Sequence, residues 1–472
     1  MNILEKNLAI ASDQEVIIAQ CTPSGIGALA LLRMTGIHTI EVATRISLLA
    51  DGQLLSQLPT HTIHYGWVID TRQNSDSTQL KNIKLDNVLF FLMRGPKTFT
   101  GQDTVEITCH NNPFIIESII QQAILHGARL AQNGEFSFRA VLNNKIDVLQ
   151  AEAINELIHA NTQMGLKQAL AQVNGSFSSW IQKIEKQLLK ILAFCQASFE
   201  FIDEEITFDD QIKEMVAHAL SELNAAKITF DQQKHIRNGI RIALVGSVNV
   251  GKSSIFNFFL QQNRAIVTDI AGTTRDVIEA GLYRTGNYWT LIDTAGLRET
   301  DNTIEQVGII KSFEQAQLAD IILLVFDGSR AFSQNENIIY ADLYEQYKDK
   351  IIMVCNKVDL PQASETIDWQ SYPVSTKNGT GFSDLEKALE ERVEKLFATI
   401  NSPFLLNKRQ FNIITALEKD VKHIETLLYS TLQYEIIAYH LVDALAHCSE
   451  LTGKSISEQG LDLVFREFCV GK

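Results

Sequence analysis

The sequence predicts a multidomain protein that combines α/β and all-α parts, including one doubly wound, mostly parallel sheet. Its 472 residues exceed what a single hydrophobic core holds and suggest about three domains. Hydrophobic residues make up 45% and charged residues 21%, a balance that excludes a disordered chain. Strand-like and helix-like patterns occupy different parts of the sequence, which divides the chain into segments of different predicted structure.

Residues 1–143 are predicted to form a compact α/β domain. Short apolar or β-branched runs alternate there with turn residues, and one stretch, residues 114–126, has helical spacing. The predicted strands are residues 15–19, 28–33, 88–93 and 105–109.

Residues 144–237 and 400–472 are predicted to be helical. The first segment contains no proline, and in both segments apolar residues recur at helical spacing. The clearest series are Ile181, Ile184, Leu188, Ile191 and Cys195 in the first segment, and Ile414, Leu417, Val421, Ile424 and Leu428 in the second.

Residues 238–399 alternate short buried strands with helices, which is typical of a doubly wound parallel sheet. The predicted strands are residues 240–245, 288–292, 321–326, 351–354 and 372–374. The helices on either side could pack as one domain into which this sheet is inserted, or they could form two separate bundles. Spacing favours neither arrangement.

The net charge of −15 (41 basic minus 56 acidic residues) argues against a protein that coats nucleic acid through its overall field. The six cysteines are scattered without zinc-like spacing, which fits a reducing compartment. No targeting segment and no apolar run of membrane-spanning length is visible, so we expect a cytoplasmic protein without a membrane partner.

The strongest motif is a P-loop, Gly246-Ser-Val-Asn-Val-Gly-Lys252-Ser253, between a predicted strand and a predicted helix. In such a loop successive N–H groups surround phosphate oxygens at a helix N-terminus. Lys252 would supply charge to the β- and γ-phosphates, and the Ser253 hydroxyl would bind Mg²⁺.

Base identity is indicated by Asn356-Lys357-Val358-Asp359, which follows a buried strand. A carboxylate at Asp359 can accept from the ring N–H and the exocyclic amine of guanine, whereas adenine has no such paired donors. The motif therefore favours GTP over ATP. Ser375-Thr376-Lys377 follows the next strand and is placed to meet the guanine carbonyl.

Two further motifs complete the order of an unpermuted GTPase domain. Asp293-Thr294-Ala295-Gly296 suits a Mg²⁺ contact and a γ-phosphate sensor, and Thr273-Thr274 can complete the metal shell. The residue after Gly296 is Leu297, where a Ras-like enzyme has a glutamine that orients water. Residue types alone leave Glu299, Asp301 and Glu305 open as acidic replacements or as solvated loop charges.

Taken together, these motifs closely resemble the MnmE (TrmE) family of tRNA-modification GTPases. The residues that carry the resemblance include 264–276, 293–298 and the terminal Phe468-Cys-Val-Gly-Lys472, and the likeness covers essentially the whole chain. It implies four segments: an N-terminal tetrahydrofolate-binding and dimerisation domain (1–143), a helical domain in two parts (144–237 and 400–472), and an inserted G domain (238–399).

The resemblance also implies a K⁺-stimulated GTPase whose G domains meet across the nucleotide in a homodimer. By motif position, K⁺ would be bound by Asn249, Thr268, Ile270 and Thr273, Mg²⁺ by Ser253 and Thr274, and water would be oriented by Glu305. The implied GTP-binding residues are Asn249, Val250, Gly251, Lys252, Ser253, Ser254, Thr268, Asp269, Ile270, Ala271, Gly272, Thr273, Thr274, Asp293, Thr294, Ala295, Gly296, Asn356, Lys357, Asp359, Ser375, Thr376 and Lys377.

For 5-formyl-tetrahydrofolate or a related folate, the matching positions are Arg33, Glu106, Lys145 and Lys472. This sequence departs from the family in Thr22-Pro-Ser-Gly-Ile-Gly-Ala and in Cys109-His-Asn-Asn, which replaces the usual His-Gly-Gly. The family's terminal motif places a cysteine near the folate pocket, so Cys469 is either a nucleophile or a side chain packed beside Phe465 and Phe468.

The function that the resemblance implies is modification of carbon 5 of the wobble uridine in certain tRNAs, by addition of an aminomethyl or carboxymethylaminomethyl group. The implied partner is the FAD-dependent protein MnmG (GidA), in a heterotetrameric or larger complex. Because this chain is acidic, we expect that partner to supply much of the tRNA phosphate recognition. Two rival functions are a ribosome-assembly GTPase and a non-catalytic GTP-gated scaffold.

Overall fold

The computed structural model describes residues 14–72, 83–200, 209–227, 230, 233–262, 278–293, 315–362, 369–398, 404–430, 434–455, 464, 465, 468 and 471. These residues fall into two compact units. The first unit contains residues 1–155, 171–221 and 412–472, and the second contains residues 156–170 and 222–411. Within the described ranges no helix combines the length and the apolar content that crossing a membrane requires.

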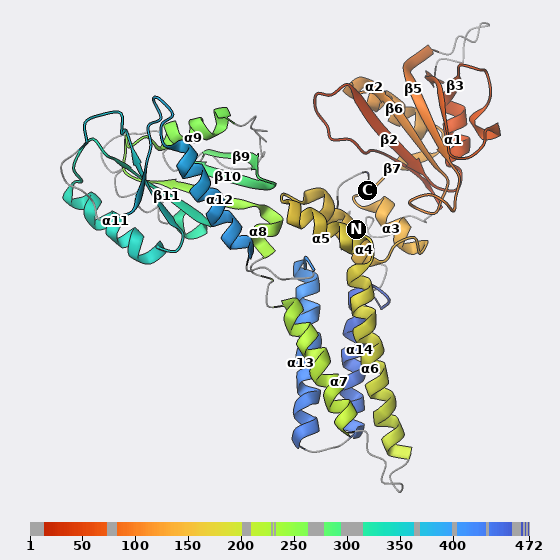
Figure 1. The fold of residues 1–472 in the computed structure, drawn as a ribbon. Helices are drawn as coiled ribbons and strands as arrows, with labels where there is room; N and C mark the ends of the chain where they lie inside the picture. The colour runs from red at the N-terminus through yellow and green to blue at the C-terminus, as the bar shows by residue number, and fades with distance from the viewer. Residues whose placement is uncertain are drawn as a thin grey trace, which may run out of the picture. The chain divides into compact units, whose positions relative to one another are not determined.

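The first unit is built on a seven-stranded sheet with the order β3-β4-β5-β6-β2-β1-β7, in which only β1 and β7 pair in parallel (Figure 1). Its strands are β1 (Val16–Gln20), β2 (Leu29–Thr35), β3 (Ser47–Leu49), β4 (Thr62–Asp70), β5 (Ile83–Met93), β6 (Thr104–His110) and β7 (Ala128–Leu130). The helices α1 (Thr39–Ile46) and α2 (Pro113–Leu125) share one buried core with this sheet. The other face buries Phe136 of α3 (Glu135–Leu142) against Ile17 and Ala19.

The expectation of a single helix before residue 143 was wrong, because α1 and α3 and the 3-10 turn η2 (Leu55–Gln57) also form. In α1 the β-branched residues favour a strand by propensity. Its buried residues are Thr39, Ile40, Val42, Ala43 and Ile46. Their spacing of three and four places the apolar side chains on one face of a helix, so tertiary burial overrides propensity.

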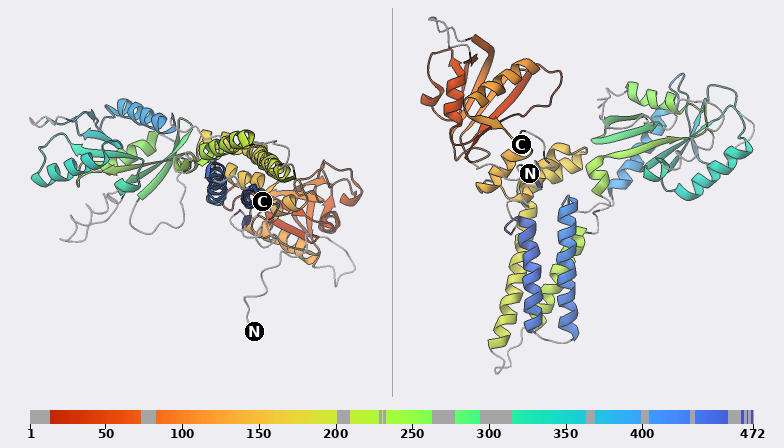
Figure 2. Two further views of the ribbon diagram at one scale, coloured as in Figure 1. Left: turned by 90° about the horizontal axis from the view of Figure 1, so that it is seen from below. Right: turned by 180° about the vertical axis from the view of Figure 1, so that it is seen from behind.

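The long helices of the first unit come from both sides of the second sheet in the sequence. They are α6 (Ser176–Glu200), α7 (Asp209–Lys227), α13 (Lys408–Ser430) and α14 (Tyr434–Thr452), and they lie side by side (Figures 1 and 2). α6 packs against α14, and Tyr434 of α14 donates a hydrogen bond to Asp209 of α7. Both apolar series predicted from the sequence are buried. Helices that flank the sheet in the sequence therefore pack together.

α4 (Val148–His159) joins the N-terminal sheet to this helical part. Its Val148 and Ala151 are buried with Phe138, Phe465 and Phe468. The phenylalanines at the end of the chain thus pack on the first unit, although most of the helix predicted around residues 461–468 lies outside the described residues. Near the end of the chain, the Cys21 thiol donates to the Gly471 carbonyl at 3.2 Å.

The second unit contains a six-stranded sheet with the order β13-β12-β11-β8-β10-β9, and all of its pairs are parallel except β9 with β10. The strands are β8 (Ile240–Val245), β9 (Ile278–Arg284), β10 (Asn287–Asp293), β11 (Ile321–Asp327), β12 (Ile351–Asn356) and β13 (Ser371–Pro373). α9 (Lys252–Gln262) and α12 (Phe382–Ala398) cover one face, and α11 (Gln334–Tyr347) covers the other. The predicted doubly wound, mostly parallel sheet is confirmed.

Residues 156–170 belong to the second unit because the turn before α5 (Gln163–Val173) pairs with the β9–β10 hairpin. Gln163 donates its N–H to the Gly286 carbonyl at 2.8 Å. The Thr162 hydroxyl donates to the Ile236 carbonyl in α8 (Gln233–Asn238) at 2.6 Å. This turn is therefore held from two sides within the unit.

A buried ion cluster fixes α3 to the N-terminal sheet. Glu135 is 2% exposed and Arg139 is 0% exposed, and they pair at 2.8 Å. Arg129 of β7 reaches the other Glu135 oxygen at 2.8 Å, and Arg139 also donates to the Glu15 carbonyl at 2.7 Å. Two positive groups thus converge on one carboxylate in the interior.

Replacing Glu135 by glutamine is expected to destabilise the first unit by about 3–5 kcal/mol, because the Arg139 charge stays buried without this carboxylate. Peptide-resolved hydrogen exchange in urea measures the effect at β1 and α3. The matched control is Glu117→Gln, since Glu117 is an exposed residue of α2 and should change stability by less than about 0.5 kcal/mol. Equal effects of the two substitutions would contradict the prediction.

The same variant gives a pH test. Burial alone would raise the pKa of Glu135, but bonds from Arg129, the Gln132 N–H and Arg139 outweigh it and hold the pKa below its ordinary 4.5. A carboxyl group with a depressed folded pKa adds stability that is complete above the unfolded pKa and is lost as pH falls through the folded value. The stability difference between wild type and Glu135→Gln should therefore shrink progressively below pH 4.5.

Candidate nucleotide site

The loop between β8 and α9 carries the P-loop sequence, and close contacts require two of its glycines. A Cβ atom on Gly246 would lie 2.2 Å from the Val325 carbonyl oxygen, and one on Gly251 would lie 2.1 Å from Asn356 Nδ2. Asn249 has a φ of 64°, a left-handed conformation that asparagine tolerates better than most residues. The result is a tight turn at the N-terminus of α9, where free N–H groups favour phosphate oxygens.

Lys252 is folded back over this loop. Its Nζ donates to the carbonyl oxygens of Gly246 at 2.7 Å and Ser247 at 2.8 Å, and the residue is only 7% exposed. Burial lowers the pKa of Lys252, although the negative charge of Asp293 opposes that shift. A cation whose direct partners are backbone carbonyls is well placed to turn toward a phosphate.

Oxygen ligands suited to Mg²⁺ lie at the same place. Ser253 is exposed in the first turn of α9, and Asp293, 2% exposed, ends β10. β10 pairs with β8 in parallel, with Asp293 opposite Leu244, so its carboxyl end meets the sheet edge from which the P-loop starts. Hydroxyl and carboxylate oxygens are the ligands that Mg²⁺ prefers, so these residues fit the ion.

The proposed base-recognition motif contacts the P-loop directly. Asn356 ends β12, is 1% exposed, and donates from Nδ2 to the Val250 carbonyl at 2.8 Å. Asp359 is exposed and accepts a hydrogen bond from the Ser375 hydroxyl at 2.7 Å. That bond lowers the pKa of Asp359, so the side chain is an ionised acceptor ready for two N–H groups.

Lys357 is fixed by a residue that sequence reasoning missed. Its Nζ donates to Asp327 at 2.7 Å, and Asp327 also accepts from the Ser329 hydroxyl at 2.6 Å. Asp327 ends β11 directly beside Asn356. The signal was present in the sequence as an acidic residue immediately after the predicted strand 321–326. A buried carboxylate there orients the lysine stem that we expect to lie along the base.

In the N-terminal sheet, two of the predicted folate-binding residues lie together. Arg33 of β2 and Glu106 of β6 are opposite each other in register and pair at 2.7 Å. The Arg33 guanidinium also lies 5.7 Å from the centre of the Phe136 ring. Lys145 instead donates from Nζ to the Pro96 carbonyl at 2.8 Å. A partly exposed cation, an acceptor and an aromatic ring therefore share one region of the sheet.

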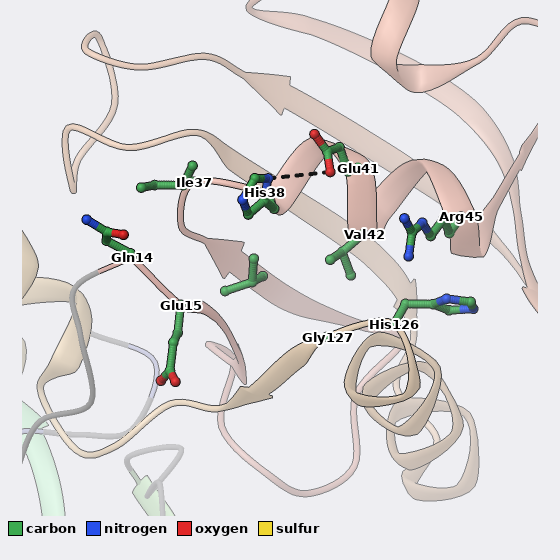
Figure 3. A pocket seen from close by; sticks show the side chains of 10 residues that line it. Gln14, Glu15, Ile37, His38, Glu41, Val42, Arg45, His126 and Gly127 are labelled. Atoms are coloured by element: carbon green, nitrogen blue, oxygen red, sulfur yellow. Dashed lines mark ion pairs between the residues drawn. The ribbon is translucent and has the colours of Figure 1, made fainter.

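A groove of about 420 Å³ opens elsewhere on this domain, beside α1 and the end of α2 (Figure 3). His38 and Glu41 pair at 3.4 Å on its wall. Burial and the nearby Arg45 charge lower the pKa of His126, which also lines the groove. Arg33, Glu106 and Lys145 are not among the lining residues, so the groove is separate from the predicted folate positions.

Comparison with known proteins identifies the family. A model described as the MnmE helical domain matches residues 148–469, and one described as the GTP-binding protein TrmE N-terminus matches residues 16–145. The chain belongs to the MnmE family. The tRNA modification GTPase MnmE of Flavobacterium johnsoniae is 32% identical over 98% of this chain and 100% of its own length. The protein of that name from Bacillus cereus is 34% identical over 97% and 99%.

Among solved structures, Aquifex aeolicus Era bound to GDP and aluminium fluoride is 22% identical. It covers 32% of this MnmE-family chain and 56% of its own, with a TM-score of 0.26. The family assignment rests on the family models and on the full-length relatives instead.

Several residues that the MnmE resemblance assigns to the site fall outside the described part of the chain. They are Thr268, Asp269, Ile270, Ala271, Gly272, Thr273, Thr274, Thr294, Ala295, Gly296, Glu305, Cys469 and Lys472. The described residues predicted to bind GTP come from the loops after β8, β12 and β13, from the start of α9 and from the end of β10. The carboxyl edge of a parallel sheet is where such folds bind nucleotides.

Proposed function

We propose that this chain is a GTP hydrolase that acts in tRNA modification. The observation that carries the proposal is the pairing of a P-loop with an ionised, exposed Asp359 on one sheet edge, joined by the Asn356–Val250 hydrogen bond. Phosphate and guanine recognition thereby share one edge of the sheet. The membership of the chain in the MnmE family supports tRNA as the molecule whose modification the hydrolysis serves.

In this proposal the phosphates lie against the P-loop N–H groups, and Lys252 moves from the Gly246 and Ser247 carbonyls to the β- and γ-phosphates. Ser253 and Thr274 would hold Mg²⁺, and Asn249, Thr268, Ile270 and Thr273 would hold K⁺. When bound, these cations supply positive charge beside the bond that breaks. Glu305 orients the attacking water, a role that needs positioning more than basicity.

The finer parts of the proposal follow the MnmE resemblance. Two copies associate through the domain of residues 1–143 and bring their G domains (238–399) together, and the helical domain (144–237 and 400–472) completes each copy. Arg33, Glu106, Lys145 and Lys472 hold a folate, and MnmG is the flavoprotein partner. The Arg33–Glu106 pair supports the folate site, since a guanidinium suits a glutamyl carboxylate and Glu106 can accept from pterin N–H groups.

Hydrolysis of GTP is expected to be at least about 10-fold faster in KCl than in NaCl at equal ionic strength, because bound K⁺ would supply the positive charge that an arginine finger supplies in other GTPases. Phosphate release under saturating GTP measures this. Equal rates in both salts would remove the K⁺ site from the proposal. Absence of turnover in either salt would favour the non-catalytic scaffold.

The tRNA assignment has its own experiment. Nucleosides of tRNA from a strain that lacks this protein are analysed by mass spectrometry, with the complemented strain as control. Loss of the carbon-5 substituent at wobble uridines is expected. Normal wobble uridines together with a ribosome-assembly defect would favour the rival function.

A further inference from the structure

Ser247, the second residue of the P-loop, is held by Tyr340, a side chain of α11 on the sheet face opposite α9. The Ser247 N–H donates to Tyr340 Oη at 2.9 Å, and the Tyr340 hydroxyl donates to Ser247 Oγ at 2.9 Å. A second acceptor, the Val325 carbonyl, is farther away at 3.4 Å. Tyr340 lies in α11 and is 2% exposed, so the contact is shielded from water.

Glu336 lies in the first turn of α11, the helix that carries Tyr340. It forms the capping box of α11 with Ser333, and Arg330 holds both of its oxygens, at 2.6 and 2.8 Å. The bonds from Arg330, followed by those from the Ser333 N–H and the Ser247 side chain, lower the pKa of Glu336 to about 2 against the effect of burial. The ionised carboxylate thus holds the first turn of α11.

The bond to Tyr340 holds the peptide group between Gly246 and Ser247, and Lys252 contacts the same part of the loop. Lys252 Nζ donates to the Gly246 and Ser247 carbonyls, and the Ser247 N–H between those two carbonyls donates to Tyr340 Oη. Because the first turn of the loop is already fixed without a ligand, less conformational entropy is lost when phosphate binds. A network of this kind acts on affinity more than on the chemical step.

We infer that Tyr340 is a positioning residue that pre-orders the P-loop through Ser247 and so raises the affinity for guanine nucleotides. This inference rests on the proposed function, because it assumes that GTP and GDP bind at this loop. It adds α11, which carries none of the recognised nucleotide motifs, to the parts of the chain that determine binding.

A double-mutant cycle on Tyr340→Phe and Ser247→Ala tests the inference, with fluorescent GDP as the probe. Ser247→Ala, which loses one neutral hydrogen bond, is expected to weaken binding about 3- to 10-fold, and Tyr340→Phe, which also loses the bond from the Ser247 N–H, at least as much. The double variant should bind no more weakly than Tyr340→Phe, because that substitution already removes the bond that Ser247→Ala removes. The KM for GTP should rise by a similar factor, with a smaller change in kcat.

Tyr344→Phe is the matched control. Tyr344 lies one turn further along α11 and stacks on Trp369, so loss of its hydroxyl should leave GDP affinity unchanged. Unchanged affinity in Tyr340→Phe, or effects of the two substitutions that multiply in the double variant, would overturn the inference alone. A wild-type protein that binds no guanine nucleotide would overturn the proposed function and the inference together.

Discussion

Replacing Asp359 by asparagine is expected to lower the affinity for GTP by roughly 10²- to 10⁴-fold and to create a preference for xanthosine triphosphate. Two N–H bonds to a charged acceptor are worth about 1.5–3 kcal/mol each, and both are lost or opposed. Asparagine presents one acceptor and one NH₂ donor, so its donor would face the exocyclic amine of guanine. Xanthine has a carbonyl at that position, which restores a donor–acceptor match.

Hydrolysis of the two triphosphates by wild type and variant measures this exchange. Asp342→Asn is the control, since Asp342 is an exposed residue in the middle of α11. The Ser375 hydroxyl bond can persist to the asparagine oxygen, which keeps the side chain in place. A variant that still preferred GTP would remove Asp359 from base recognition.

Sequence patterns predicted the second sheet well because its strands are buried on both faces. All seven residues of β11 are buried, and such uninterrupted apolar runs bounded by turn residues can be recognised without other information. The motifs at the ends of these strands could be placed for the same reason. Once β8, β10 and β12 are parallel neighbours or near neighbours in one sheet, their carboxyl ends share an edge.

The edge strand β9 was not predicted, because its sequence contains no uninterrupted apolar run. Gly281 interrupts it, and the reason for that glycine is visible only after pairing, since its Cβ would coincide with the Tyr288 hydroxyl of β10. The spacing of residues in the sequence cannot show which side chain of a neighbouring strand will lie over a given residue. β4 was missed on similar grounds, because Thr62, His64 and Tyr65 give it no buried run at its start.

Contacts between motifs could not be predicted from the sequence, because they join residues that are far apart along the chain. The Tyr340–Ser247 contact joins residues 93 positions apart, and the Lys357–Asp327 pair joins neighbouring strands. In the sequence, Tyr340 is indistinguishable from the other apolar residues on one face of a helix. Its contact with the P-loop is visible only once α11 is packed on the sheet. Sequence motifs identified the residues expected to touch the nucleotide, whereas the residues that hold those in place became visible only in the fold.

Lys252→Met is expected to lower kcat/KM for GTP by about 10²- to 10³-fold, the usual effect of removing one preorganised donor to a developing charge. The same change should leave the nucleotide-free protein as stable as before, or more stable. Burial lowers the pKa of Lys252, which means that its charge is disfavoured in the empty site. Methionine fills similar space without that charge, so the lysine is maintained for phosphate binding at some expense of stability.

Thermal unfolding with and without GDP separates the two effects. In wild type, GDP raises the unfolding temperature because it binds only the folded state, and in Lys252→Met that rise should disappear. Lys350→Met is the matched control, since Lys350 also donates to a backbone carbonyl, that of Ala319 at 2.9 Å, but lies outside the nucleotide motifs. It should keep the full GDP response. If Lys252→Met instead unfolded at a lower temperature without nucleotide, Lys252 would be a structural residue of the loop.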